Sequence, residues 1–123
     1  MYEKIATEAE CSAAAEKILG ALGLARRAGK LETGGEVCEE KIRSGGTVLA
    51  VLACDVSENS EKKLHAAMRA KEVPYIVLPT DKKQLGARLG KSSFCVACAI
   101  CDEGFAKIVY KALGKEPKKN CEM

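Results

Sequence analysis

The residues best suited to hold an anion lie in the stretch Thr33-Gly34-Gly35-Glu36. Thr33 with a glutamate three positions later is the pattern of a capping box, which predicts that a helix begins at about Thr33. Gly34 and Gly35 would leave the amides of the first turn free of side chains, and such amides attract anionic or acceptor-rich groups. Three cations lie close by in the sequence: Arg26, Arg27 and Lys30. The stretch therefore predicts a surface for an anionic partner.

Three cysteines at regular spacing, Cys95, Cys98 and Cys101, raise the possibility of a zinc or iron–sulfur site. In a strand, however, Cys95 and Cys101 would share one face roughly 20 Å apart while Cys98 points to the opposite face. The intervening residues are also core types rather than turn formers. We therefore predict small buried cysteines with no metal and no cofactor, and keep a metal or redox role as the alternative.

Motifs for catalysis and nucleotide binding are absent from the sequence. His65 is the only histidine, and it lies in a charged helical pattern without a neighbouring nucleophile. The sequence holds no G-x-S-x-G, no G-x-G-x-x-G and no G-x-x-x-x-G-K-[ST]. Lys82, Lys83 and Arg88 are interpreted as a solvated face. We predict a protein that is not an enzyme.

Composition limits the remaining classes of protein. The chain has 123 residues of which 47% are apolar, enough for one ordinary core. Only 4% are aromatic, which disfavours a stacking platform for single-stranded nucleic acid, and a net charge of +3 is compatible with a phosphate partner. Seven cysteines without a signal-peptide pattern disfavour a disulfide framework. No apolar run reaches the roughly 18 residues of a membrane span, so we expect a cytoplasmic protein.

Hydrophobic periodicity predicts how helices and strands alternate along the chain. Continuous apolar runs predict buried strands at 48–54, 73–78 and 94–101, and Leu31 could add a short further strand. Helices are predicted from Ser12 to about Gly29, from about Thr33 to 44, from Ser57 or Asn59 to about Lys71, after a Thr80 cap, and after an Asp102 cap.

This alternation predicts an α/β fold, a three-layer α/β/α sandwich around a small mixed sheet of about four strands. Residues 13–113 are expected to form a single α/β/α domain. Residues 1–12 are expected to be a frayed or disordered lead, and residues 114–123 a mobile basic tail.

Several separated motifs in this order resemble a known family. Between residues 18 and 113 the chain resembles the ribosomal protein family that binds RNA kink-turns, most closely its bacterial YlxQ-like branch. The resemblance covers about four fifths of the chain and is carried by LGLARRAGK at 22–30, TGGE at 33–36, LACDVS at 52–57, VPY at 73–75, LGxxxG at 85–90 and DEGFA at 102–106. It implies a single α/β/α sandwich that binds structured RNA of ribosomal origin, without catalysis.

The resemblance also implies which residues meet the RNA. The family's helix start, G-x-N-E-x-x-K, places its asparagine on Gly35, its glutamate on Glu36 and its lysine on Glu39, so only the glutamate is kept. Glu36 is then implied to accept hydrogen bonds from guanine N1 and N2 in sheared G·A pairs, with Thr33 and Gly34 beside it. Further implied contacts come from Lys30, from Asp55 and Val56 after the first strand, and from the loop with Lys91, Ser92 and Ser93.

The departures at Gly35 and Glu39 support an alternative within the same fold. Gly35 offers no side-chain hydrogen bond, and Glu39 replaces a phosphate-pairing cation by an anion. The alternative is a protein-interaction or ribosome-assembly module in which RNA binding is weakened. In either case we expect a monomer, with ribosome-associated proteins as further partners.

Overall fold

Strands and helices alternate along the whole described chain. A computed structural model describes residues 2–6, 8–91 and 93–115. Along these residues the elements are β1 (Lys4–Ala6), α1 (Glu8–Arg27), β2 (Leu31–Thr33), α2 (Gly35–Ser44), β3 (Leu49–Leu52), α3 (Glu58–Lys71), β4 (Tyr75–Val77), α4 (Lys82–Arg88), β5 (Ala97–Ile100) and α5 (Glu103–Ala112).

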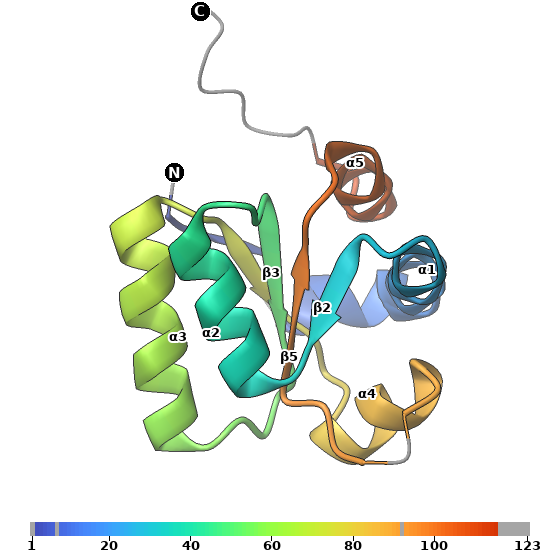
Figure 1. The fold of residues 1–123 in the computed structure, drawn as a ribbon. Helices are drawn as coiled ribbons and strands as arrows, with labels where there is room; N and C mark the ends of the chain where they lie inside the picture. Colours follow the sequence, from blue (N-terminus) through green and yellow to red (C-terminus); the bar gives the residue numbers. More distant parts are fainter. Residues whose placement is uncertain (1, 7, 92, 116–123) are drawn as a thin grey trace, which may run out of the picture.

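The sheet at the centre is mixed. Its strand order is β1-β4-β3-β5-β2, in which β1, β4 and β3 run parallel and β5 runs antiparallel to both of its neighbours. Helices α2 and α3 lie on one face, and α1, α4 and α5 lie on the other (Figure 1). This confirms the predicted three-layer sandwich. The sheet described here has five strands rather than about four, because β1 joins its edge.

Two apolar layers enclose the sheet. All residues of β3 and β5 are buried, as expected for continuous apolar runs covered on both faces. Side chains alternate, so Cys98 and Ile100 pack towards α1 and α5, whereas Ala97 and Ala99 pack towards α2 and α3. No helix in the described ranges is both long and apolar enough to cross a membrane.

The structure differs from the prediction of a frayed or disordered lead at the amino-terminal residues. Lys4–Ala6 forms β1 beside β4, and α1 begins at Glu8 with Cys11 fully buried, so a frayed lead over residues 1–12 is wrong for these residues. A three-residue strand is too short to show a period, and only its partner in the sheet defines it. At the other end, the predicted basic tail at 114–123 lies outside the described residues from 116 onward.

Helix caps agree with the sequence in two places and differ in two. Ser57 caps α3 and Asp102 caps α5, as predicted. The predicted capping box at Thr33 is wrong, because Thr33 pairs with Cys98 in the sheet. The short helix α4 has Asp81 rather than Thr80 as its N-cap, and its capping box is closed by Gln84. Thr80 instead is buried, and its carbonyl accepts from the amide of Cys54.

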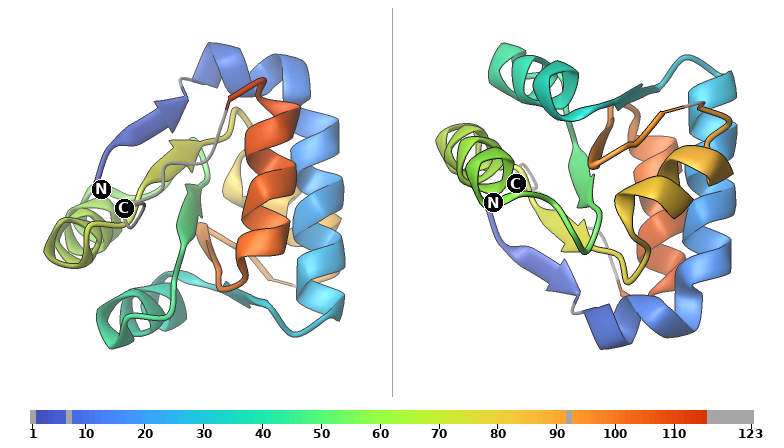
Figure 2. Two further views of the ribbon diagram at one scale, coloured as in Figure 1. Left: turned by 90° about the horizontal axis from the view of Figure 1, so that it is seen from above. Right: turned by 90° about the horizontal axis from the view of Figure 1, so that it is seen from below.

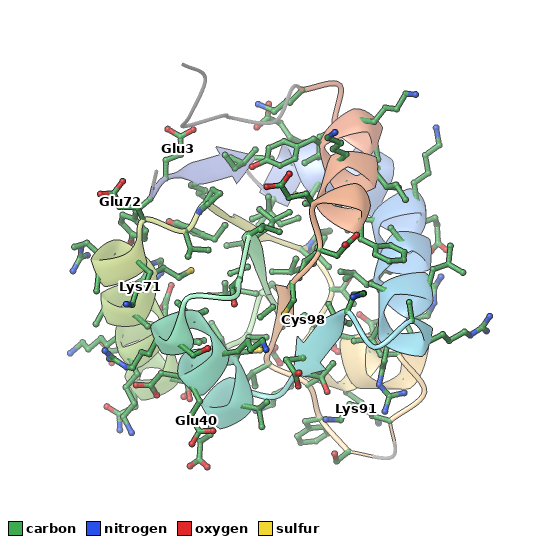
Figure 3. All side chains as sticks on the ribbon, turned by 45° about the horizontal axis from the view of Figure 1, so that its top comes forward. Glu3, Glu40, Lys71, Glu72, Lys91 and Cys98 are labelled. Atoms are coloured by element: carbon green, nitrogen blue, oxygen red, sulfur yellow. The ribbon has the colours of Figure 1, made fainter. Side chains whose placement is uncertain are left out.

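The predicted strand at 94–101 is shorter than expected, and this changes the cysteine geometry. Only Ala97–Ile100 is a strand, so Cys95 precedes it and does not follow its alternation. The Sγ atoms of Cys95 and Cys98 lie 3.7 Å apart in the core, and Figure 3 labels Cys98. The prediction that they face opposite sides is therefore wrong. Their hydrogen bond lowers the pKa of Cys95 to about 7 and, together with burial, raises the pKa of Cys98.

We expect the purified protein to carry no stoichiometric zinc or iron. Within the described ranges, no three His, Cys, Asp or Glu side chains are placed to hold a metal ion. The Sγ of Cys101 donates to the carbonyl of Ala99 rather than joining the Cys95–Cys98 pair, and structural zinc sites take four ligands. Metal analysis of anaerobically purified protein tests this. One zinc or iron per chain would contradict it.

Candidate nucleic-acid interface

The segments that follow β2, follow β3 and precede β5 meet at one edge of the sheet, the one formed by the ends of these strands. Because β3 and β5 are antiparallel, the end of β3 and the beginning of β5 lie together, and the amide of Ala53 donates to the carbonyl of Val96 at 2.9 Å. The amide of Gly34 donates to the carbonyl of Ala97 at 3.0 Å, which brings the start of α2 to the same edge. The right-hand view of Figure 2 faces this edge. We call it the α2 edge.

The start of α2 is open and carries no side-chain cap. Gly34 occupies the N-cap position at φ 103°, a conformation that glycine adopts readily, and no side chain accepts from the first turn. Among the described residues, no acceptor is found for the amides of Gly35, Glu36 and Val37. Glu36 and Val37 are exposed. The helix therefore presents unpaired donors and the positive end of its dipole to solvent.

Glu36 is not engaged in a capping box. Since Thr33 belongs to β2, the Glu36 carboxylate has no such partner, and within the described part of the chain no hydrogen bond or ion pair holds it. Gly35 lies close to β5, because a Cβ at this position would come 3.2 Å from the Cγ2 of Val96. The carboxylate of Glu36 is therefore available to an external donor.

Lys91 places a cation at the α2 edge. Its Nζ donates to the Thr33 Oγ1 at 3.1 Å, and its amide donates to the carbonyl of Gly86 at 2.8 Å. Figure 3 labels Lys91 on the segment between α4 and β5. Thr33 is thus a partner of Lys91 rather than a helix cap.

The segment between α4 and β5 packs tightly on α4. A Cβ at Gly86 would overlap the carbonyl oxygen of Ser93, and the amide of Cys95 donates to the carbonyl of Lys82 at 3.0 Å. These contacts leave Phe94 58% exposed, with the Nζ of Lys82 5.3 Å from the centroid of its ring. Ser93 is exposed, whereas Ser92 lies outside the described residues. The sequence placed Phe94 in a buried strand, so this exposed aromatic ring was missed.

Asp55 and Val56 lie at the α2 edge, but their side chains make contacts within the protein itself. The Oδ1 of Asp55 accepts from the amide of Lys82 at 2.8 Å, which ties the turn after β3 to the start of α4. Val56 packs against the core between the sheet and helices α2 and α3. Both residues position the surrounding loops.

Lys30 and Glu39 differ from the arrangement that the resemblance implied. Lys30 lies at the opposite end of β2, where its carbonyl accepts from the amide of Cys101 at 2.9 Å, so the structure does not bring it to the α2 edge. Glu39 pairs with Arg43 on the same helix at 3.1 Å. Its negative charge is therefore partly balanced.

A basic groove beside the α2 edge adds cations outside the predicted set. It has a volume of about 670 Å³ and lies between the end of α1, β2, the first turn of α2 and the end of α4. Arg26 donates to the carbonyl of Leu89 at 2.6 Å, and Arg88 pairs with Glu16 at 2.7 Å. Arg27 also lines the groove and has no ion-pair partner among the described residues. The sequence indicated Arg26 and Arg27 as cations close to the Thr33–Glu36 stretch, but Arg88 was interpreted as part of a solvated face.

Comparison with known proteins identifies the family. Residues 16–110 match the model of the Ribosomal protein L7Ae/L30e/S12e/Gadd45 family. The chain belongs to this family. Within it, the chain is similar to two curated proteins, each called RNA-binding protein YlxQ. The one from Enterococcus faecium is 36% identical over 75% of this chain and 86% of its own length, and the one from Bacillus subtilis is 35% identical over 69% and 83%.

Solved structures agree with the L7Ae-type fold. A protein of unknown function from Bacillus halodurans is 29% identical with a TM-score of 0.71, over 80% of this chain and 98% of that one. A 15.5 kD RNA-binding protein from Giardia lamblia has a TM-score of 0.66 at 20% identity, over 82% and 85%, which supports the fold alone. The family match over residues 16–110 and the two YlxQ relatives confirm the predicted family resemblance.

Proposed function

We propose that this L7Ae-family chain is a non-catalytic RNA-binding protein that docks its α2 edge on a kink-turn in structured RNA. The observation that carries the proposal is the open start of α2, where unpaired amides and the Glu36 carboxylate lie exposed beside Lys91 and the basic groove. The YlxQ relatives are RNA-binding proteins by name, which supports the same function here. We further propose that the RNA is ribosomal and that the chain acts as a cytoplasmic monomer.

Each group at the α2 edge suits a different part of the RNA. A carboxylate accepts from the N1–H and N2–H groups of guanine, so Glu36 would contact a base edge. The amides of the first turn and the side chains of Arg27 and Lys91 would meet phosphate oxygens, which position the RNA. The exposed ring of Phe94 offers a surface on which an unstacked base can lie.

The direct test compares two RNAs of equal length and charge. Fluorescently labelled kink-turn RNA and a straight duplex are titrated with the protein at several salt concentrations. We expect tighter binding to the kink-turn, with affinity that falls as salt rises because released counterions contribute to binding. Equal affinity for the two RNAs would contradict the proposal.

The second candidate function is a protein-interaction or ribosome-assembly module of the same fold. Two observations favour it: Gly35 has no side chain to offer the RNA, and Glu39 adds an anion near the docking surface, although Arg43 balances part of its charge. No binding of either RNA at micromolar protein would support this candidate. A clear preference for the kink-turn would exclude it as the main function.

Arg27→Gln is expected to reduce the salt dependence of RNA binding. If the guanidinium neutralises one phosphate, the slope of log affinity against log salt becomes about one unit less steep, and both RNAs lose affinity by similar factors. Lys63→Gln, on the exposed side of α3, is the matched control because it removes the same charge on the other face of the sheet. Salt titrations of the three proteins measure the slopes. Equal slopes for all three would contradict the role of Arg27.

A further inference from the structure

The exposed large apolar side chains of the described residues fall into two pairs. Val37 and Phe94 lie at the α2 edge and its groove. Leu24 and Ile108 lie on α1 and α5, with 53% and 45% of their surface exposed. The first pair lies at the proposed RNA-docking surface, where the Phe94 ring is assigned to an unstacked base. The RNA-binding proposal leaves the second pair without a function.

Leu24 and Ile108 line a groove between α1 and α5, which we call the α1–α5 groove. The two helices lie side by side on the face of the sheet away from α2 and α3 (Figure 2). The groove has a volume of about 680 Å³, and small residues form its floor: Gly20, Ala21 and Ala112. A Cβ at Gly20 would meet no atom within 4 Å, so the groove is open at this point. A helical ridge of another protein would fit such a floor.

Positive charge borders the α1–α5 groove. Lys17 lines it from α1 and Lys111 lines it from α5, and neither has an ion-pair partner among the described residues. The acidic neighbours on α1 are already paired, Glu10 with Lys115 at 3.2 Å and Glu16 with Arg88 at 2.7 Å. The groove therefore combines an apolar floor with unbalanced cations at its rim.

We propose that the α1–α5 groove binds an amphipathic helix of a partner protein. Its apolar residues would pack between Leu24 and Ile108, and its Asp or Glu side chains would pair with Lys17 and Lys111. A second copy of this chain fits less well, because its own Lys17 and Lys111 would meet like charges. RNA also fits less well, because the apolar floor offers no hydrogen bond to a phosphate or a base edge.

Site-specific photo-crosslinking tests the proposal in the full chain. A benzoylphenylalanine at position 108, added to extract of the native host, is crosslinked and the attached peptide is sequenced by mass spectrometry. We expect a peptide from another protein with apolar residues at i and i+4 and acidic residues beside them. Crosslinks to RNA, to this chain itself, or no more crosslinks than from the same probe at exposed Ala66 on α3 would overturn the proposal.

Charge reversal provides the second readout. The double variant Lys17→Glu/Lys111→Glu is expected to reduce the crosslink at least about tenfold, because it sets like charges against the acidic partner. Lys62→Glu/Lys63→Glu on α3 carries the same change of charge and is expected to keep the crosslink. Both variants alter exposed side chains, and equal urea midpoints check that they fold. A crosslink that survives the reversal at Lys17 and Lys111 would contradict the proposed pairing.

Discussion

Glu36→Ala is expected to lower the affinity for kink-turn RNA by about 10- to 100-fold while leaving the affinity for a straight duplex nearly unchanged. Hydrogen bonds to a charged group contribute about 1.5–3 kcal/mol, and Glu36 is exposed at the open start of α2 with no capping box to occupy it. A base-edge contact is lost only from the RNA that presents that edge. Paired titrations of the two RNAs measure the effect.

The chain offers a closely matched control for Glu36. Glu103 is also an exposed acidic residue in the first turn of a 10-residue helix, but α5 begins at the opposite edge of the sheet. Glu36→Ala and Glu103→Ala each remove one negative charge from the first turn of a helix, so both weaken a favourable interaction with the helix dipole. Removing an anion by itself favours binding to the RNA polyanion, so an equal loss of kink-turn affinity in both variants would contradict the base contact proposed for Glu36.

Gly86→Ala is expected to lower the free energy of unfolding by about 1–3 kcal/mol, the usual range for overpacking a tight contact. The new Cβ would overlap the carbonyl oxygen of Ser93, and a backbone group cannot rotate away as a side chain can. The segment that carries Lys91 and Phe94 must therefore move. We expect a lower urea midpoint with an unchanged slope, and weaker RNA binding under conditions where the variant is still folded.

Gly20→Ala is the control for Gly86→Ala. Gly20 lies inside α1, and a Cβ there would meet nothing within 4 Å. Alanine inside a helix is favoured over glycine by about 0.5–1 kcal/mol, so this variant is expected to be more stable than the parent. A Gly86→Ala protein that is as stable as Gly20→Ala would show that the segment before β5 is not held by its contact with α4.

Much of the fold could be predicted from the sequence because apolar runs and helix caps depend on residues that are close together in the chain. The apolar runs around β3, β4 and β5 all form strands, fully buried in β3 and β5 and partly buried in β4, and the caps at Ser57 and Asp102 depend only on residues one turn away. The resemblance added several loops that do meet at the α2 edge. Their contacts with RNA remain predictions.

The errors arose where a distant partner decides the local structure. Thr33 has the spacing of a helix cap, yet pairing with Cys98 draws it into the sheet. Lys30 is close to Gly34 in sequence, but β2 lies between them and separates them to opposite edges. Cys95 lies next to Cys98 because the chain before Ala97 is not extended as a strand. None of these pairings has a signal within a short window of sequence.

The central sheet can be completed only after β5 has been synthesised. This strand follows the other four in the sequence, yet it lies between β3 and β2, and its Ala97 carbonyl accepts the hydrogen bond that fixes Gly34. A nascent chain that ends before Ala97 therefore has the strands β1, β4 and β3 but no strand to join them to β2, and such non-local pairing slows folding. The surface at the start of α2 is complete only after Ala97–Ile100 has been synthesised, so the proposed RNA contact cannot form before β5 has joined the sheet.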